Sequence, residues 1–364
     1  MSIDGFFIKL TSRLEARNST IEAWIARVLR RIRISLSLGV LRSQRKDKLK
    51  AINLYVNSKF PNINLNEYFY DIYLRYDNIL HDEVKSTLYP ECFISEEKII
   101  DKYHNVLADG EIKKNTADNF DVRCLSRMRG DFIKFGYVVA PFELSDDAVQ
   151  NFMQASRKIE YTLSGLVQPG IDTAYLPDTP AAAKAVQYLH KVNQGSESLY
   201  PHAVRSLIFD ISCYLMQQKS LALCSDQFWY SYPVKAAPGQ HDAAQGWHFD
   251  LDALSWIKVF TFFTPVDERS GAHEAVLGSH LSGAKPAAVR AYGTQRLPVD
   301  LIERTYGSSK VFELPAGSIV FGDTKCLHRG RPLKASGYRC MYQFYLTVPP
   351  GSFHWPTIKV HNFK

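Results

Sequence analysis

The chain has 364 residues, of which 46% are hydrophobic, 22% charged and 13% aromatic, and this composition excludes a disordered, collagen-like or coiled-coil protein. Six dispersed cysteines without a C-x-x-C pair disfavour a zinc-thiolate site and a secreted disulfide framework. The net charge of +7 is concentrated in residues 1–50, which hold 12 basic and 4 acidic residues, whereas the remainder holds 32 and 33. That balance disfavours a catalytic domain that follows a nucleic acid.

The first fifty residues predict a basic amphipathic helix near residues 20–33. The segment STIE at 19–22 has the form of a capping box, and apolar residues follow at helical spacing. Arginines occupy the other face, and the basic run continues to residue 50. The helix fits an anionic membrane surface, but docking on the protein's own core or on a second subunit is the commoner use of such a helix. Because no signal-peptide core or membrane-spanning run is evident, we expect a cytoplasmic protein, with peripheral contact at the inner face of a membrane through residues 20–50 as an alternative.

Residues 51–115 are rich in Tyr and Phe and predict a helical layer with an aromatic core. The stretch Glu111–Asn119 loses apolar periodicity and is interpreted as a linker. We therefore predict three parts: an N-terminal helical extension at 1–115, a catalytic domain at 116–350 and a C-terminal tail at 351–364.

The catalytic part is expected to be mainly β. Phe135–Val139 predicts a strand, and Ser145 then caps a helix. Trp256–Phe263, Ser318–Phe321 and Tyr338–Val348 predict further strands separated by turn residues. Short strands at such intervals favour a sandwich or barrel with helices packed outside.

The segment WHFD at 247–250 carries the strongest chemical signal. Residues i and i+2 of a strand point to the same face, so His248 and Asp250 can converge on one point. An imidazole and a carboxylate placed in this way supply two of the three ligands that hold non-haem Fe(II). The same form in His81-Asp82-Glu83 lies in a stretch that looks helical, and we interpret it as accidental.

A third ligand must come from a distant strand. The candidates are His273, His280, His328, His354 and His361, and His328 is preferred because it follows the apolar strand Ser318–Phe321 after a short connection. If His328 and Tyr338–Val348 form adjacent strands, Arg339 lies beside the ligands, where its guanidinium could hold a carboxylate. Lys258 is the first alternative to Arg339 for that task.

The order H-x-D, then a His 78 residues after Asp250, then an Arg 11 residues later, resembles the phytanoyl-CoA dioxygenase family of Fe(II)/2-oxoglutarate oxygenases. Supporting resemblances span residues from about 125 to 350 and include GDFIKFGYVVAPFELSDDAVQNF, WIKVFTFFTPVDERSGAHEAVLGSH and GSIVFGDTKCLHRGRPLKASGYRCMYQFYL. The resemblance implies a double-stranded β-helix core of the jelly-roll or cupin type. It also implies His248, Asp250 and His328 as iron ligands and Arg339 as the residue that binds 2-oxoglutarate.

Further positions are assigned through the same resemblance. Gln227, at the head of the strand before the insertion APGQHDAAQG, is similar to a glutamine that helps to hold 2-oxoglutarate. The turn GSH at 278–280 matches a family signature in which the histidine is not a ligand. Leu277 replaces the usual proline before that turn, and Phe249 fills the variable position between the first two ligands.

The implied reaction uses Fe(II), 2-oxoglutarate and O2 to hydroxylate an organic small molecule, lipid or glycan, with succinate and CO2 as co-products. A carboxylate at position 250 favours hydroxylation over halogenation, because related halogenases have a small residue there. A nucleic-acid substrate is disfavoured, since demethylases of this type carry a second arginine where this chain has Tyr345. Aromatic residues near the site suit a small molecule or serve as core: Trp229, Tyr230, Tyr232, Trp247 and Trp256.

Two alternatives remain open. One is a catalytically silent β-barrel that binds or scaffolds through its basic N-terminus. The other is a polar core network in place of the metal site, which is disfavoured because buried His and Asp residues rarely occur together without such a partner.

Overall fold

The computed structural model describes residues 94–115, 119–167, 170, 172–192, 198–235, 245–250, 255–281, 283–290, 292, 296–334 and 337–347. The chain divides into two compact units, Met1–Leu88 and Tyr89–Lys364, and all described residues belong to the second. Three features named from the sequence lie outside the described residues: the predicted helix near 20–33, His81, and the C-terminal tail with His354 and His361. No helix among the described residues is long and apolar enough to cross a membrane.

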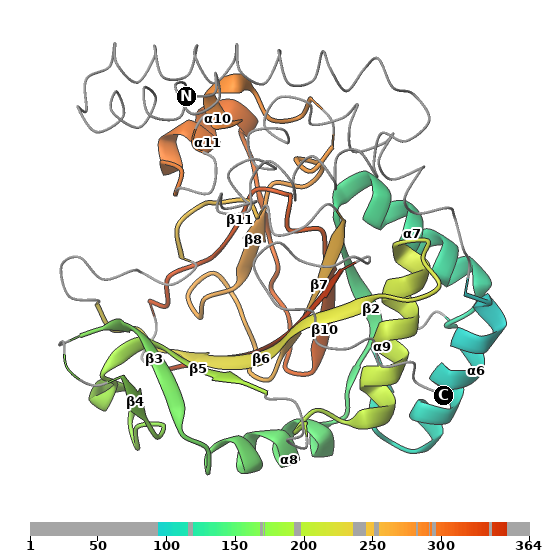
Figure 1. Ribbon diagram of the computed structural model, residues 1–364, viewed down its shortest axis with the longest axis horizontal. Coiled ribbons are helices and arrows are strands. Elements are labelled where there is room, and N and C mark those ends of the chain that lie inside the picture. Colours follow the sequence, from blue (N-terminus) through green and yellow to red (C-terminus); the bar gives the residue numbers. More distant parts are fainter. Residues whose placement is uncertain are drawn as a thin grey trace, which may run out of the picture. The chain divides into compact units, whose positions relative to one another are not determined.

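The helices of this unit begin where the sequence supplies capping side chains. The Oγ atom of Ser95 accepts a hydrogen bond from the backbone of α6, and Asp121 and Ser145 do the same for α7 and α8. α6, α7 and α9 pack against one another and form one group in Figure 1. The bounds are α6 Glu96–Ala108, α7 Val122–Phe135, α8 Asp146–Ser156, a 3-10 turn Pro180–Ala182, α9 His202–Leu215, α10 Ala287–Arg290 and α11 Val299–Tyr306.

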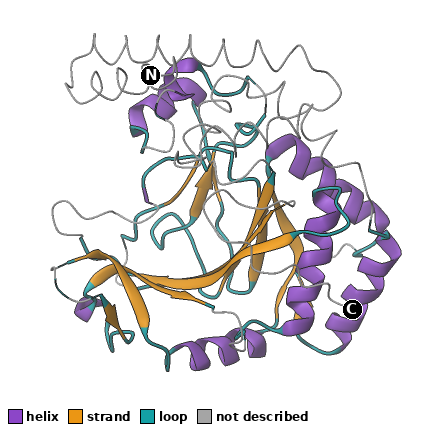
Figure 2. Cartoon of the chain, viewed as in Figure 1, coloured by secondary structure: helices purple, strands orange, loops and turns teal. Residues whose placement is uncertain are grey.

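The strands form two antiparallel sheets (Figure 2). The larger has the order β1-β2-β10-β7-β12-β6-β5-β3-β4 and the smaller β11-β8-β9. The larger sheet contains β1 Ile112–Lys114, β2 Tyr137–Leu144, β3 Tyr161–Leu166, β4 Thr173–Ala174, β5 Ala185–Lys191, β6 Ala222–Ser231, β7 Trp256–Phe262, β10 Ser318–Gly322 and β12 Arg339–Thr347. The smaller contains β8 His273–Ala275, β9 Lys310–Val311 and β11 His328–Gly330.

One cluster of buried hydrophobic residues lies between these two sheets. Trp229, Phe260 and Met341 of the larger sheet share one buried cluster with Ala275 and Phe312 of the smaller sheet and its flank. Because side chains alternate along a strand, this contact identifies the inner face of the larger sheet. The predicted class, a mainly β double-stranded β-helix with flanking helices, is confirmed for this unit.

Three local predictions need correction. The stretch interpreted as a linker, Glu111–Asn119, contains β1, which pairs with the end of β2, so Ile112–Lys114 is part of the larger sheet. The predicted strand at Phe135 begins only at Tyr137, because α7 continues to Phe135 and ends at Gly136. Gly136 has a φ of +79°, and a side chain there would also collide with the Sγ of Cys326, so glycine is required at this helix end.

The third correction concerns the neighbours of β11. The strand of His328 pairs with β8 in the smaller sheet, whereas β12 pairs with β6 and β7 in the larger one. The two strands are therefore not adjacent, and Arg339 approaches the site from the opposite sheet. The sequence did not show this change of sheet. A short turn-rich segment joins His328 to Arg339, and its length does not distinguish a hairpin from a crossover.

Candidate metal centre

Two histidines are brought together by backbone pairing. His248 forms an isolated antiparallel bridge with His328, the first residue of β11. The backbone N–H of each donates to the carbonyl oxygen of the other, at 3.0 and 2.8 Å. A directly opposed pair has both side chains on one face of the sheet. The two imidazole rings therefore lie side by side, with centroids 4.2 Å apart.

Second hydrogen bonds orient both rings. The Nδ1 atom of His248 lies 2.9 Å from the carbonyl oxygen of Gly246, and that of His328 lies 2.9 Å from the carbonyl oxygen of Cys326. Because a carbonyl oxygen only accepts, each Nδ1 carries the proton and each Nε2 keeps a free lone pair. This tautomer is the one in which a histidine binds a metal ion through Nε2.

Asp250 completes the cluster. Its backbone N–H donates to the carbonyl oxygen of Thr324 at 2.9 Å, which holds the segment in place beside β11. Its carboxylate oxygens lie 3.9 Å from Nε2 of His248 and 3.7 Å from Nε2 of His328. Ligand atoms of the three residues all lie within 4.8 Å of one another, and among the described residues no other group of three has this arrangement.

The electrostatics of the cluster keep its groups ready for a cation. Burial lowers the pKa of His248 well below its usual value and also lowers that of His328, so both rings are neutral near pH 7. Burial alone would raise the pKa of Asp250, but the ammonium of Lys258 and the two histidines outweigh it, and that pKa is lowered. Lys258 projects from β7, and its Nζ lies 2.6 Å from Oδ2 of Asp250.

The two other described histidine candidates are occupied elsewhere. Nε2 of His273 lies 3.1 Å from the hydroxyl of Tyr137. Nε2 of His280 lies 3.1 Å from the carbonyl oxygen of Ile133, and its Nδ1 lies 3.3 Å from the Sγ of Cys326. These histidines support the packing of β8 and of the GSH turn rather than joining the cluster.

Arg339 is a buried cation whose recorded partners are neutral. Its guanidinium donates to the carbonyl oxygen of Gly271 and to Oγ of Ser231 at 3.1 Å, and its Nε has no hydrogen-bond partner among the described residues. Burial lowers its pKa to about 10, so it remains charged at neutral pH. A Cβ added to Gly330 of β11 would lie 3.0 Å from its Nη1, so Arg339 reaches across to the strand of His328.

Gln227 lies in the middle of β6, not at the head of its strand as expected from the sequence. It is opposite Gln343 of β12, on the same inner face as Trp229 and Met341. Its Oε1 is buried without a hydrogen-bond partner in the part of the chain that the structure describes. Gln227 and Arg339 are therefore two positions of the inner face at which a buried polar atom lacks a partner.

Two basic residues lie near the cluster. The sequence analysis named one of them only as a substitute for Arg339 and did not name the other. Lys258, the alternative to Arg339, contacts Asp250 directly. Arg296 was missed altogether: it follows a segment without a regular pattern, and nothing in the sequence pairs it with the metal segment. Its charge acts on His248 and Asp250.

The aromatic residues considered as substrate contacts belong to the core. All five are buried, and Trp229 lies in the cluster between the sheets. Tyr230 bonds the hydroxyl of Ser156 at 2.7 Å on the other face of β6. The indole N–H of Trp256 donates to Oγ1 of Thr324 at 2.8 Å.

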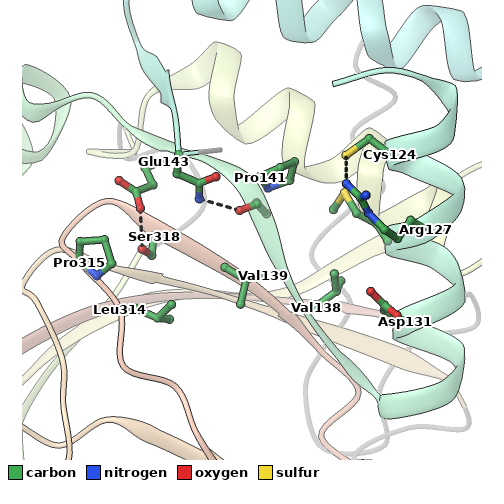
Figure 3. A pocket seen from close by; sticks show the side chains of 13 residues that line it. Cys124, Arg127, Asp131, Val138, Val139, Pro141, Glu143, Leu314, Pro315 and Ser318 are labelled. Carbon is green, nitrogen blue, oxygen red and sulfur yellow. Dashed lines mark hydrogen bonds between the residues drawn. The ribbon is translucent and has the colours of Figure 1, made fainter. Parts of the chain in front are cut away.

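A cavity of about 450 Å³ lies away from the cluster, between α7, β2 and the loop before β10. Figure 3 shows Arg127 and Asp131 of α7 on one side of it and Glu143, Leu314 and Ser318 on the other. The carboxylate of Glu143 accepts a hydrogen bond from Ser318 at 3.3 Å. None of the cluster residues lines this cavity, so the cluster does not open into it.

Comparison with known proteins agrees with the fold. A family model described as phytanoyl-CoA dioxygenase (PhyH) matches residues 132–341. A search of curated proteins found no match.

Solved structures are similar at low identity. The non-haem alpha-ketoglutarate-dependent epimerase SnoN from nogalamycin biosynthesis is 16% identical, with a TM-score of 0.45, covering 62% of this chain and 84% of SnoN. EvdO2 from Micromonospora carbonacea, solved with 2-oxoglutarate, is 15% identical with a TM-score of 0.45, covering 68% and 97%. HygX from Streptomyces hygroscopicus, solved with nickel and 2-oxoglutarate, is 13% identical with a TM-score of 0.41, covering 61% and 87%.

Proposed function

The chain belongs to the phytanoyl-CoA dioxygenase family, whose enzymes depend on Fe(II), 2-oxoglutarate and O2, and we propose that it hydroxylates an organic small molecule, lipid or glycan. The observation that carries the proposal is the cluster of His248, Asp250 and His328, whose ligand atoms all lie within 4.8 Å of one another. Two imidazoles and one carboxylate are the donor set of non-haem Fe(II) oxygenases.

The residues of the site fit both the metal and the co-substrate. The two Nε2 atoms and the carboxylate converge with their tautomers already set by backbone carbonyls. Arg339 supplies a buried positive charge with an unpaired Nε, and a dicarboxylic acid would provide the missing negative partner. Neither feature is expected of a polar network that only stabilises a core.

We assign the roles as follows. His248, Asp250 and His328 hold the iron, and Arg339 binds the distal carboxylate of 2-oxoglutarate. Gln227 lies opposite Gln343, four positions along β12 from Arg339 and on the same inner face, and we assign it as a second contact to the co-substrate. When bound, iron and 2-oxoglutarate supply the oxidising power: O2 is consumed, one oxygen atom enters succinate, CO2 is released, and the other oxygen atom enters the substrate.

The remaining work of the protein is positioning and exclusion of water. The paired backbones of His248 and His328 fix the ligand spacing, and their burial keeps bulk solvent from the reacting centre. Asp250 occupies the ligand position that halogenases of this class leave to a halide, which supports hydroxylation.

The test is a screen of candidate metabolites for substrate-stimulated release of succinate, followed by mass spectrometry of the product under ¹⁸O₂. A hydroxylase yields a product that is one labelled oxygen atom heavier than its substrate. An unchanged mass would indicate epimerisation, and the loss of two hydrogens would indicate ring closure or desaturation. Either result would contradict the proposed hydroxylation.

For residues 20–50 we propose contact with an anionic membrane surface. The excess of basic residues in this segment supports the proposal, since each one near such a surface contributes about 1 kcal/mol. Co-sedimentation with anionic liposomes at low salt, compared between the full chain and a chain that starts at Ala51, tests it. Equal sedimentation of the two would contradict it.

A further inference from the structure

The turn at residues 323–326 joins the two sheets beside the cluster of proposed metal ligands. It follows β10 of the larger sheet and precedes β11 of the smaller one, which begins at His328. The carbonyl oxygen of Thr324 accepts the backbone N–H of Asp250 at 2.9 Å. The carbonyl oxygen of Cys326 lies 2.9 Å from Nδ1 of His328 and orients that ring. This one turn therefore positions two of the three proposed ligands relative to each other.

The turn is closed by its own first residue. Oδ1 of Asp323 accepts the backbone N–H of Lys325 at 3.0 Å, and its carbonyl oxygen accepts the N–H of Cys326 at 2.9 Å. Bonds of this kind between a side chain and the backbone two residues later restrict the local backbone conformation. The Nζ of Lys325 also pairs with Oδ2 of Asp323 at 3.1 Å. These bonds fix the shape of the turn, whereas its place against the larger sheet needs a contact with a strand.

Trp256, the first residue of β7, supplies that contact. Its indole N–H donates to Oγ1 of Thr324 at 2.8 Å, and both residues are completely buried. An indole N–H can only donate, so a buried one requires an acceptor at a fixed place. Lys258 lies two residues along the same strand and on the same face, and it contacts the carboxylate of Asp250. Asp250 is therefore tied to β7 twice, at its carboxylate through Lys258 and at its backbone through Thr324.

We propose that Trp256 and Thr324 are positioning residues for the metal ligands, acting through the hydrogen bond between their side chains. The inference rests on the proposed function, because it assumes that the cluster binds a divalent ion. Neither side chain is a ligand. Trp256 holds Thr324, and the carbonyl oxygen of Thr324 holds Asp250, so loss of the bond lets the turn move and the ligands diverge. Groups that orient ligands in this way typically change metal affinity by about 10–100-fold when removed.

The experiment measures Co(II) binding to the full-length protein by competition with a chelating indicator, together with the visible absorption of bound Co(II), which depends on ligand geometry. Trp256→Phe removes the indole N–H, and Thr324→Val replaces the hydroxyl by a methyl group of similar size. Thr324→Ser keeps the hydroxyl. Tyr230→Phe is the matched control, because it removes a buried hydrogen bond to Ser156 on the other face of β6. Urea unfolding of each metal-free variant measures its loss of stability.

We expect Trp256→Phe and Thr324→Val each to lower the affinity for Co(II) about tenfold or more and to shift its absorption bands. Thr324→Ser and Tyr230→Phe should keep both the affinity and the bands of the unaltered protein. Combining Trp256→Phe with Thr324→Val should weaken binding no more than either alone, because both remove the same bond. If Trp256→Phe does not fold, the comparison of Thr324→Val with Thr324→Ser decides.

Two results would overturn this inference alone. One is an unchanged Co(II) affinity and spectrum in Thr324→Val, which would show that the bond only stabilises the core. The other is an equal loss of affinity in Tyr230→Phe, which would show that any lost buried hydrogen bond has the same effect. Absence of Co(II) binding in the unaltered protein would overturn the proposed function together with the inference.

Discussion

The two ends of the site differ in how completely their polar groups are satisfied. At the metal end, on the smaller sheet, both Nδ1 atoms have carbonyl partners and Asp250 has an ammonium partner. At the proposed co-substrate end, on the larger sheet, Arg339 and Gln227 each keep a buried polar atom without a hydrogen-bond partner among the described residues. The proposed metal end is therefore preorganised by the chain itself, whereas the proposed co-substrate end presents polar groups that a bound ligand would satisfy.

Removing a proposed metal ligand tests the metal end of the site. In His248→Ala or His328→Ala, two remaining ligands cannot hold a labile divalent ion, so Fe(II) binding and 2-oxoglutarate turnover should both be lost. Metal content after desalting and succinate release measure the effect. His280→Ala is the control, because that histidine bonds the GSH turn and should leave the metal in place. Stoichiometric iron in either ligand variant would contradict the assignment.

Removing the buried guanidinium of Arg339 tests the proposed co-substrate end of the site. Arg339→Leu should weaken 2-oxoglutarate binding by about a hundredfold or more while iron stays bound, since loss of one partner of a buried charge pair costs about 2–5 kcal/mol. Gln227→Leu removes only neutral hydrogen bonds and should weaken binding about tenfold or less. Equilibrium dialysis of labelled 2-oxoglutarate measures both variants. Unchanged affinity in Arg339→Leu would transfer the role to another basic residue.

Lys258→Met tests the same comparison by removing the partner of a polar group at the proposed metal end. The variant leaves the buried carboxylate of Asp250 without its ammonium partner, which should destabilise the metal-free protein by about 3 kcal/mol. A divalent ion restores the missing positive charge, so added metal should raise the Tm of this variant more than that of the unaltered protein. Thermal unfolding with and without Co(II) measures the difference. Equal metal-induced shifts in the two proteins would argue against competition between Lys258 and the metal.

A further effect is expected without any substitution, in the dependence of stability on pH in the metal-free protein. Burial lowers the pKa of His248, His273 and His328, so the unfolded chain binds protons below about pH 6.5 while the native state does not. Stability should therefore be complete above that pH and fall below it, by up to about 1.4 kcal/mol per pH unit for each histidine. The lowered pKa of Asp250 adds a further loss below about pH 4.

Urea unfolding at pH 7.5 and 5.5 measures this loss. His273→Phe, which removes one buried histidine that is not a ligand, should reduce the slope by about a third of the histidine contribution. A flat profile between the two pH values would show that the histidines are protonated in the native state or accessible to solvent.

Part of the cluster of His248, Asp250 and His328 was predictable from sequence, because it depends on local spacing. The i, i+2 placement of His248 and Asp250 needs only an extended backbone, and His328 was selected by its position after an apolar strand and by the resemblance to the family. Helix starts at Ser95 and Ser145 likewise follow from short-range capping, and only the second was predicted. These features require no knowledge of which strands pair.

The remaining features depend on pairings that sequence spacing does not determine. Arg339 was placed on a strand adjacent to His328, but it belongs to the other sheet and approaches across the core. Arg296 acquires its position from a single bridge between distant loops. Lys258 was named only as a substitute for Arg339, because alternation along β7 does not show which carboxylate its side chain meets.

The most direct test of the central claim is anaerobic titration of the protein with Fe(II) and then 2-oxoglutarate, followed by visible absorption. A preorganised triad with a complementary co-substrate end should develop the metal-to-ligand charge-transfer band at one equivalent of each. Arg339→Leu should develop the band only at much higher 2-oxoglutarate concentration, and His248→Ala should not develop it. No band in the unaltered protein, despite bound iron, would contradict the claim and favour a catalytically silent barrel.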